Sequence, residues 1–108
     1  MDFKLAKVVV FAPLSHADKV RIALAKAGAG GIGKYDTCSF SARGTGRFRA
    51  LKGSNPFIGK EDKLEEVEEE RIEVICPAKI LDKVLAAVKE VHPYEEPAID
   101  VYPLLNRA

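Results

Sequence analysis

The sequence has few of the features that direct a protein to a membrane or to an oxidising compartment. Its 108 residues include two cysteines, Cys38 and Cys76, whose separation matches neither a metal-binding pair nor the disulfide framework of a small secreted domain. No segment approaches the roughly 18 apolar residues of a membrane-spanning helix. The short apolar run at 8–14 is not followed by the small-residue cleavage site of a signal peptide. We therefore expect a protein of the cytoplasm.

An excess of charge of one sign is also missing. The sequence has 17 Lys and Arg residues against 16 Asp and Glu residues, a formal net charge of +1. This balance disfavours nucleic acids and anionic membranes as partners, and the acidic character of the charged run at 60–73 disfavours nucleic acids again. The length suits one domain with a core of its own and is too short for two. We expect a single domain over 1–108.

Hydrophobic patterns predict six elements in the order strand, helix, strand, strand, helix, strand. Apolar residues spaced three and four apart predict helices over about 16–27 and 77–90. Apolar runs and alternating patterns predict strands over 3–12, 35–40, 65–75 and 98–104, with a short strand at 47–51 after the break at Gly44-Thr45-Gly46. Ser15 and Asp18 resemble a capping box, and Pro77 is expected to open the second helix.

This order predicts an α+β, ferredoxin-like βαββαβ fold, in which both helices cover one face of an antiparallel sheet. The glycine-rich segment 28–33 follows a helix and leads into a strand, so we expect a tight connection and not a phosphate-binding loop, which would open a helix. The second face of the sheet needs cover. Another copy of the chain would supply it, which predicts a homo-oligomer.

Four segments, taken together and in this order, are similar to one known domain. They are Gly31-Ile32-Gly33-Lys34-Tyr35-Asp36-Thr37-Cys38-Ser39-Phe40, Gly44-Thr45-Gly46-Arg47-Phe48, Asn55-Pro56-Phe57-Ile58-Gly59 and His92-Pro93-Tyr94-Glu95-Glu96-Pro97-Ala98. The chain resembles a stand-alone copy of the YqfO-type domain inserted in the dinuclear-metal-centre, Nif-three-like proteins. The last segment also resembles the C-terminal part of CutA. The resemblance implies a CutA/PII-like fold and a trimer built by strand exchange at the sheet edges.

The resemblance also limits what can be carried over. In the long family members it implies that the metal ligands lie in the domains that flank this one. The present sequence has two histidines, His16 and His92, and lacks a ligand cluster at helical spacing. We therefore expect neither a dinuclear site within one copy nor the GTP cyclohydrolase activity sometimes attached to the long proteins. We expect no required cofactor.

The segment 92–97 is the strongest candidate site in the sequence. Two prolines stiffen a run that holds His92, Tyr94, Glu95 and Glu96. An imidazole with carboxylates can bind a divalent metal, with His92 and Glu95 as the candidate ligands. The alternative is structural: the prolines stiffen the connection between the second helix and the last strand, and the polar side chains hold a contact between subunits.

Two other groups of residues are weaker candidates. Asp36 and Cys38 place a carboxylate and a thiol on one segment, where they are candidates for binding a ligand or a metal. As a catalytic residue, Cys38 would need a nearby cation or base. Arg43, Arg47 and Arg49 lie among glycines and could hold an anion or a nucleotide. The alternative is that these arginines are solvated side chains at the tip of a hairpin.

Three hypotheses about function follow. The first is a non-enzymatic binding or regulatory module that binds a divalent metal, a small anion or a protein partner at clefts between subunits. The second is an enzyme that uses Cys38, His92 and the Glu95/Glu96 pair, which would have to converge in one pocket. The third is a purely structural oligomerisation or protein-interaction unit.

Overall fold

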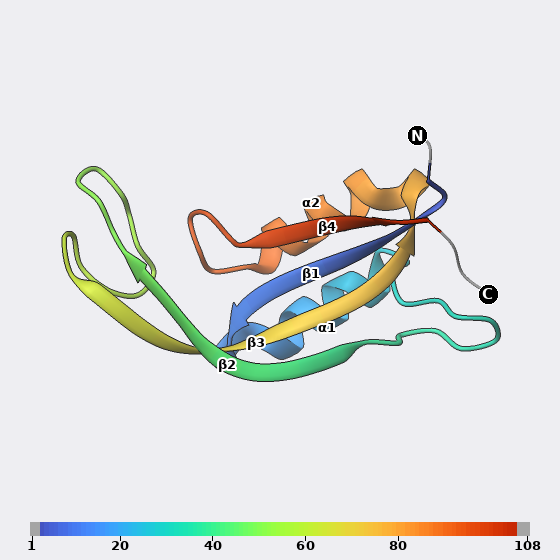
Figure 1. The fold of residues 1–108 in the computed structure, drawn as a ribbon, viewed down its shortest axis with the longest axis horizontal. Helices are drawn as coiled ribbons and strands as arrows, with labels where there is room; N and C mark the ends of the chain where they lie inside the picture. Colours follow the sequence, from blue (N-terminus) through green and yellow to red (C-terminus); the bar gives the residue numbers. More distant parts are fainter. Residues whose placement is uncertain (1–2, 106–108) are drawn as a thin grey trace.

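The computed structural model describes residues 3–105 and contains a four-stranded antiparallel sheet with two helices packed on one face (Figure 1). The elements are β1 (Leu5–Pro13), α1 (Ala17–Lys26), β2 (Phe40–Arg49), β3 (Leu64–Pro77), α2 (Leu81–Val91) and β4 (Ile99–Leu104), with 3₁₀ turns at Leu14–His16 and Ala78–Ile80. The strand order is β2-β3-β1-β4. This is the ferredoxin-like arrangement, and it confirms the predicted fold class.

The core lies between the sheet and the two helices. Alternate residues of a strand point to opposite faces of the sheet. The buried residues of this layer come from one face of β1 and β3 and from the facing sides of the helices, among them Val8, Val10, Ile72, Val74, Val20, Leu24, Val84 and Val88. The helical spacing in the sequence therefore identified the sides of α1 and α2 that are buried.

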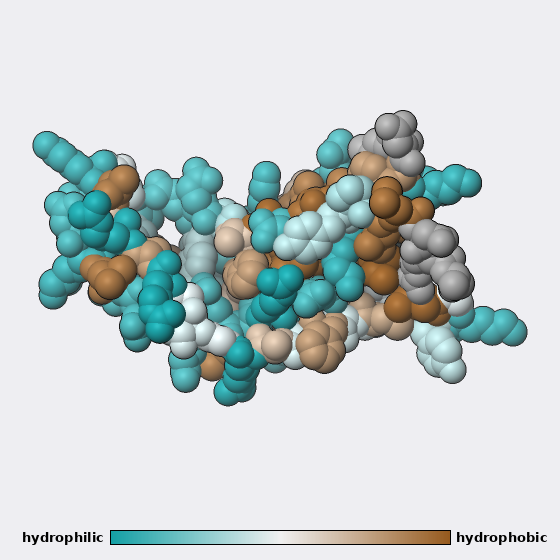
Figure 2. Space-filling view, in the orientation of Figure 1, coloured by the Kyte–Doolittle hydropathy of each residue, from teal (hydrophilic) through white to brown (hydrophobic). Residues whose placement is uncertain are grey.

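The opposite face of the sheet, which we call the open face, is covered by side chains alone. The Nζ of Lys7 lies 3.5 Å from a carboxylate oxygen of Glu73, and Arg71 donates to the same carboxylate at 3.1 Å. The guanidinium of Arg71 also lies over the ring of Phe11. Phe40, at the edge, is 67% exposed. Figure 2 views this face and shows hydrophilic and hydrophobic surface interspersed.

Strands β2 and β3 continue beyond the rest of the sheet and form a projecting arm that ends in the loop 50–63 (Figure 1). The arm accounts for the elongated shape of the domain, whose principal dimensions are 46 × 25 × 22 Å. The loop between α2 and β4, residues 92–98, lies at the same end of the sheet as the arm (Figure 1). The segments 55–59 and 92–98, which both carry the family resemblance, therefore lie at one end of the fold.

The second strand differs from its prediction. Residues 35–39 form no strand, and β2 runs without a break from Phe40 to Arg49, through Gly44 and Gly46. Ten consecutive residues of β2 pair with β3. This long-range pairing outweighs the low strand propensity of glycine, so the break that the local sequence predicted does not occur.

The predicted capping box of the first helix and the predicted start of the second helix are wrong. The side chain of Ser15 contacts Nδ1 of His16 at 2.8 Å, and no side chain caps α1. Pro77 is the last residue of β3 and not the first of a helix. A 3₁₀ turn precedes each helix, as is frequent at helix N-termini.

Within the described residues 3–105, no helix has the length and apolar character needed to cross a membrane.

Candidate functional site

The imidazole of His92 connects the end of α2 to the end of β1. His92 is buried, its Nε2 lies 2.7 Å from the carbonyl oxygen of Phe11, and its Nδ1 lies 3.2 Å from the amide nitrogen of Tyr94. The carbonyl can only accept and the amide can only donate, so these contacts assign the proton to Nε2 and a neutral ring to His92. Burial lowers the pKa of His92, which favours the same neutral form.

Tyr94 is held by a carboxylate from β3. Its hydroxyl donates to Oε2 of Glu69 at 2.8 Å. The side chain of Glu69 lies directly over Gly46 of β2, where a Cβ atom would overlap the carboxylate. Burial, and then the hydrogen bond to Glu69, raise the pKa of Tyr94. The phenol therefore stays protonated at neutral pH and acts as a hydrogen-bond donor.

The loop 50–63 is attached to the same end of the sheet by two kinds of contact. The amide of Asn55 donates to a carboxylate oxygen of Glu95 at 2.9 Å. The ring of Phe57 lies between those of Tyr94 and His16, with centroid distances of 6.4 and 5.5 Å. The edge-to-face geometry with His16 is a favourable one. The arm loop, the loop 92–98 and the 3₁₀ turn before α1 therefore support one another.

These contacts surround a pocket of about 610 Å³, which we call the arm pocket. Its lining comes from Phe11, Glu69, the β2 segment 46–51, the loop residues Ser54 and 56–58, and the segment 94–96 with Ala98. This volume is within the range of small-molecule sites, and the combination of apolar walls with a few polar groups is typical of them. Three of the four motif segments that carry the family resemblance meet here.

The arginines proposed for anion binding lie on β2. They share one face of the sheet with Ser41, and Gly46 and Phe48 lie on the opposite face. In the strand register Arg43 faces Glu70 and Arg47 faces Glu66. Arg47 donates to Glu66 at 3.1 Å, and Arg49 lies 4.0 Å from Asp62. The arginines therefore occupy the strand itself and not a hairpin tip, and two of them are paired with carboxylates of the arm.

Cys38 and His92 are not brought together. The amide of Cys38 donates to the carbonyl of Gly30, whose own amide donates to the carbonyl of Ile75. Ile75 pairs with Lys7 of β1, whereas His92 bonds to Phe11, four residues further along that strand. At about 3.3 Å per residue, the two contacts are separated by roughly 13 Å. The thiol of Cys38 lies beside the carbonyl of Asp36, at 3.7 Å.

The metal hypothesis also meets a geometric obstacle. Both ring nitrogens of His92 are already hydrogen-bonded, and one oxygen of Glu95 accepts from Asn55. Among residues 3–105, no group of three His, Cys, Asp or Glu side chains is close enough to hold a metal ion. A metal bound through His92 would have to break the contact with Phe11 or with Tyr94.

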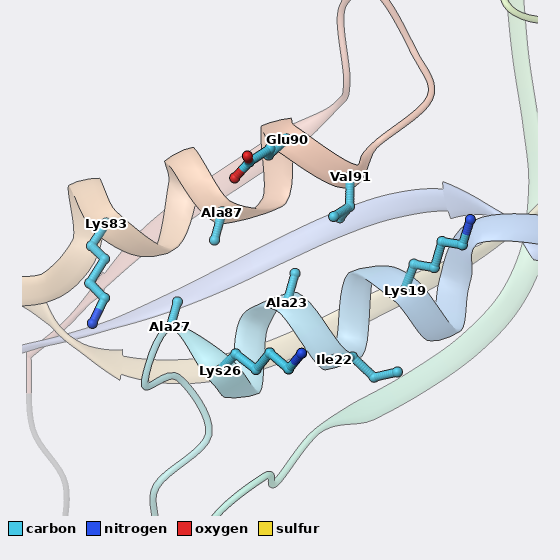
Figure 3. Close-up of a pocket in the computed structure, with 9 residues that line it drawn as sticks. All are labelled: Lys19, Ile22, Ala23, Lys26, Ala27, Lys83, Ala87, Glu90 and Val91. Atoms are coloured by element: carbon cyan, nitrogen blue, oxygen red, sulfur yellow. The ribbon is translucent and has the colours of Figure 1, made fainter.

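A second hollow, of about 440 Å³, lies between the two helices (Figure 3). Alanines of α1 and α2 form part of its floor, and Lys19, Lys26 and Lys83 stand around it with Glu90. It contains none of the candidate site residues. The groove and the arm pocket share no lining residue, so a substitution in the groove should leave the arm pocket unchanged.

Sequence reasoning missed several residues of the arm pocket, above all Glu69, Phe11 and Phe57. Glu69 belongs to an acidic run that we interpreted as an exposed face. The alternation of β3 could have indicated its position. Alternate residues of a strand lie on one face, so Glu69 lies on the same face as Arg71 and Glu73. Phe11 belongs to an apolar run that gave no sign of facing a site.

Comparison with known proteins first defines the class of the domain. No protein-family model matches the chain. The structure is similar to the periplasmic divalent cation tolerance protein CutA from Archaeoglobus fulgidus, with a TM-score of 0.71 and 20% identity, over 96% of this chain and 87% of that one. CutA1 from Pyrococcus horikoshii gives a TM-score of 0.70 at 20% identity. These likenesses establish a CutA-like, ferredoxin-like fold.

The family follows from closer relatives. The chain is 55% identical over 102 residues to a GTP cyclohydrolase 1 type 2 homolog of Halalkalibacterium halodurans, and 45% identical over 100 residues to that of Bacillus subtilis. A crystal structure of a Bacillus cereus protein related to NIF3 is 51% identical, with a TM-score of 0.84. The chain belongs to the Nif-three-like family as a YqfO-type domain. It spans about a quarter of the length of these relatives.

Proposed function

We propose that the chain is a binding module whose ligand site is the arm pocket, and that it acts as an oligomer, with a trimer as the expected arrangement. The observation that carries this proposal is the convergence of three separate segments, 44–48, 55–59 and 92–98, on one pocket. The amide of Asn55 donates to Glu95, the ring of Phe57 lies near that of Tyr94, and the Glu69 side chain that accepts from Tyr94 lies over Gly46. A segment that served only as a connection would not need such a set of contacts.

The contacts of the pocket support binding more than catalysis. His92 has no free ring nitrogen with which to take up a proton, and the raised pKa of Tyr94 makes its phenol a poor base or nucleophile. Cys38 belongs to a different part of the fold. The name GTP cyclohydrolase 1 type 2 homolog belongs to relatives about four times as long, so we do not extend that activity to this chain.

The same contacts bear on the nature of the ligand. A divalent metal would compete with the hydrogen bonds of His92. An anion would meet three carboxylates in the lining, whose two arginines, Arg47 and Arg49, already have carboxylate partners. We therefore favour an organic ligand over the metal and the small anion that the sequence suggested. A protein partner that inserts a side chain into the pocket would use the same groups.

A fragment titration tests this proposal. We expect at least one member of a set of cationic, neutral and anionic fragments to shift the amide resonances of 46–51, 56–58 and 94–96 in proton–nitrogen correlation spectra. Gly46→Ala should weaken that binding about five- to tenfold, because the added Cβ displaces Glu69 and removes the hydrogen bond of Tyr94. Gly44→Ala, on the same face and with no atom near the added Cβ, is the matched control.

Two results would contradict the proposal. One is a complete fragment set that leaves the pocket amides unmoved. The other is equal weakening by Gly44→Ala and Gly46→Ala, which would assign the effect to β2 as a whole and not to the Glu69 contact.

A structural role is the second candidate, and the exposed open face favours it. Phe40 and Tyr102 on this face are 67% and 44% exposed, and β2 and β4 are both edge strands of the sheet. Unpaired edges and exposed aromatic side chains are typical of surfaces that associate. The two candidates are compatible, because an oligomer could bring the arm pocket beside a neighbouring subunit.

Phe40→Glu tests the association. We expect the wild type to form an oligomer in size-exclusion chromatography with light scattering, and the variant to shift toward the monomer mass, because a charge would be buried in the contact. Tyr35→Glu is the control, since Tyr35 is 74% exposed and lies in the loop between α1 and β2. A monomeric wild type, or an unchanged mass for Phe40→Glu, would argue against this surface.

A further inference from the structure

We infer that the arm pocket takes an organic cation, an amine or guanidine on an apolar or aromatic body. This inference rests on the proposed function and names the ligand class of the same site. It follows from the balance of charge in the lining, from the state of each carboxylate and from the rings that surround them.

The lining carboxylates are not neutralised by the protein. Glu69, Glu95 and Glu96 all line the pocket, and none of them forms an ion pair within residues 3–105. The two arginines of the lining are directed elsewhere: Arg47 pairs with Glu66 and Arg49 lies near Asp62, and neither partner lines the pocket. The lining therefore holds three carboxylates without an ion partner in the described part of the chain, whereas its two arginines each have a carboxylate partner outside the lining.

Each carboxylate keeps acceptor capacity. Glu69 uses one oxygen for the hydroxyl of Tyr94, and Glu95 uses one for the amide of Asn55. Glu96 makes no side-chain hydrogen bond with any described residue. These contacts hold Glu69 and Glu95 in place while leaving oxygens for a donor. A cationic donor would form charge-assisted hydrogen bonds, which are stronger than neutral ones.

The walls suit the rest of such a ligand. Phe48, Phe57 and Tyr94 present aromatic surface to the pocket, and the rings of Phe57 and Tyr94 are 6.4 Å apart. Aromatic faces attract cations and also pack against apolar groups. The ring of Phe11 already has such a contact, since the guanidinium of Arg71 lies 5.5 Å from its centroid. Arg71 is itself paired with Glu73, so it leaves the pocket carboxylates free.

Three probes of one shape and different charge test the inference: phenethylamine, 2-phenylethanol and 3-phenylpropionate. At pH 7.5 we expect phenethylamine to shift the amides of 46–51, 56–58 and 94–96, with an affinity about tenfold above that of the alcohol. The acid should be the weakest of the three. Both fragment titration and calorimetry report these affinities on the assembled protein.

Substitutions assign the preference to the pocket. Glu96→Gln should weaken phenethylamine about five- to tenfold while leaving the alcohol unchanged. Glu90→Gln removes an exposed carboxylate from the groove between the helices and should change neither affinity. Phe57→Ala should weaken both the amine and the alcohol. A Glu96→Gln protein that binds the amine as the wild type does would overturn the role of this carboxylate.

The outcomes separate this inference from the proposed function. Equal or tighter binding of the alcohol or the acid at the pocket amides would overturn the cation preference and leave the pocket as a binding site. If all three probes leave those amides unmoved, the inference fails, and the larger fragment set decides whether the proposed function fails with it.

Discussion

Replacing His92 with alanine should lower the free energy of unfolding by about 2–4 kcal/mol. The ring is buried, and both of its nitrogens bond to the backbone. Its removal leaves the carbonyl of Phe11 and the amide of Tyr94 without their partner, and it leaves a cavity beside the end of β1. Unsatisfied buried polar groups are expensive. His16→Ala, in which the ring contacts Phe57 but is only half-buried, should cost much less.

The contribution of His92 should also depend on pH. Burial places the pKa of the folded ring below its ordinary value of 6.5. The unfolded chain therefore binds more protons than the folded chain in the interval just below pH 6.5, and stability is lost as the pH falls through that interval. The difference between wild type and His92→Ala should shrink between pH 7.5 and pH 5.5.

Urea unfolding followed by circular dichroism, at one fixed protein concentration, measures both effects. A His92→Ala protein as stable as the wild type would show that the two hydrogen bonds contribute nothing. A stability difference that grows as the pH falls would show that the folded state prefers the charged ring. The metal hypothesis makes a distinct prediction: bound metal would be lost with His92, whereas we expect the metal content to be independent of it.

Gly30→Ala should produce the second large loss, about 2–4 kcal/mol of unfolding free energy. Gly30 has a φ of +94°, and a Cβ there would lie 2.7 Å from the carbonyl oxygen of Cys38 and 2.9 Å from its nitrogen. These are backbone atoms, which cannot rotate away as a side-chain end can. The nitrogen of Cys38 also donates the hydrogen bond that connects the loop to the carbonyl of Gly30. The substitution would therefore separate the loop 31–39 from the sheet.

Gly31→Ala is the matched control for this prediction. The neighbouring glycine has no atom within 4 Å of an added Cβ, and its φ is outside the left-handed region. Its replacement should change the unfolding free energy by no more than about 0.5 kcal/mol. Equal effects of the two substitutions in the same urea titration would show that the close approach of Gly30 to Cys38 is not needed for stability.

Much of the fold was predictable because its signals are local. The i, i+3, i+4 spacing of Val20, Ala23 and Leu24 predicted α1 to within a residue at each end. The alternation from Arg71 to Ile75 predicted β3. The path of β2 was not predictable in the same way, since Gly44 and Gly46 look like a break in the sequence, and only the pairing with β3 makes the strand continuous.

The sequence by itself determined the order of the elements, the buried sides of the helices and a sheet with one face free of helices. Each of these depends on residues that are neighbours along the chain. The arm pocket was decided by tertiary structure alone. Gly46, Glu69 and Tyr94 come from three separate elements, and their meeting depends on the register of β2 against β3 and on the anchoring of the loop 92–98 by His92. The same register places Arg47 opposite Glu66, with which it forms an ion pair. A pattern read along one strand does not contain that register, because it is set by the packing of the whole sheet.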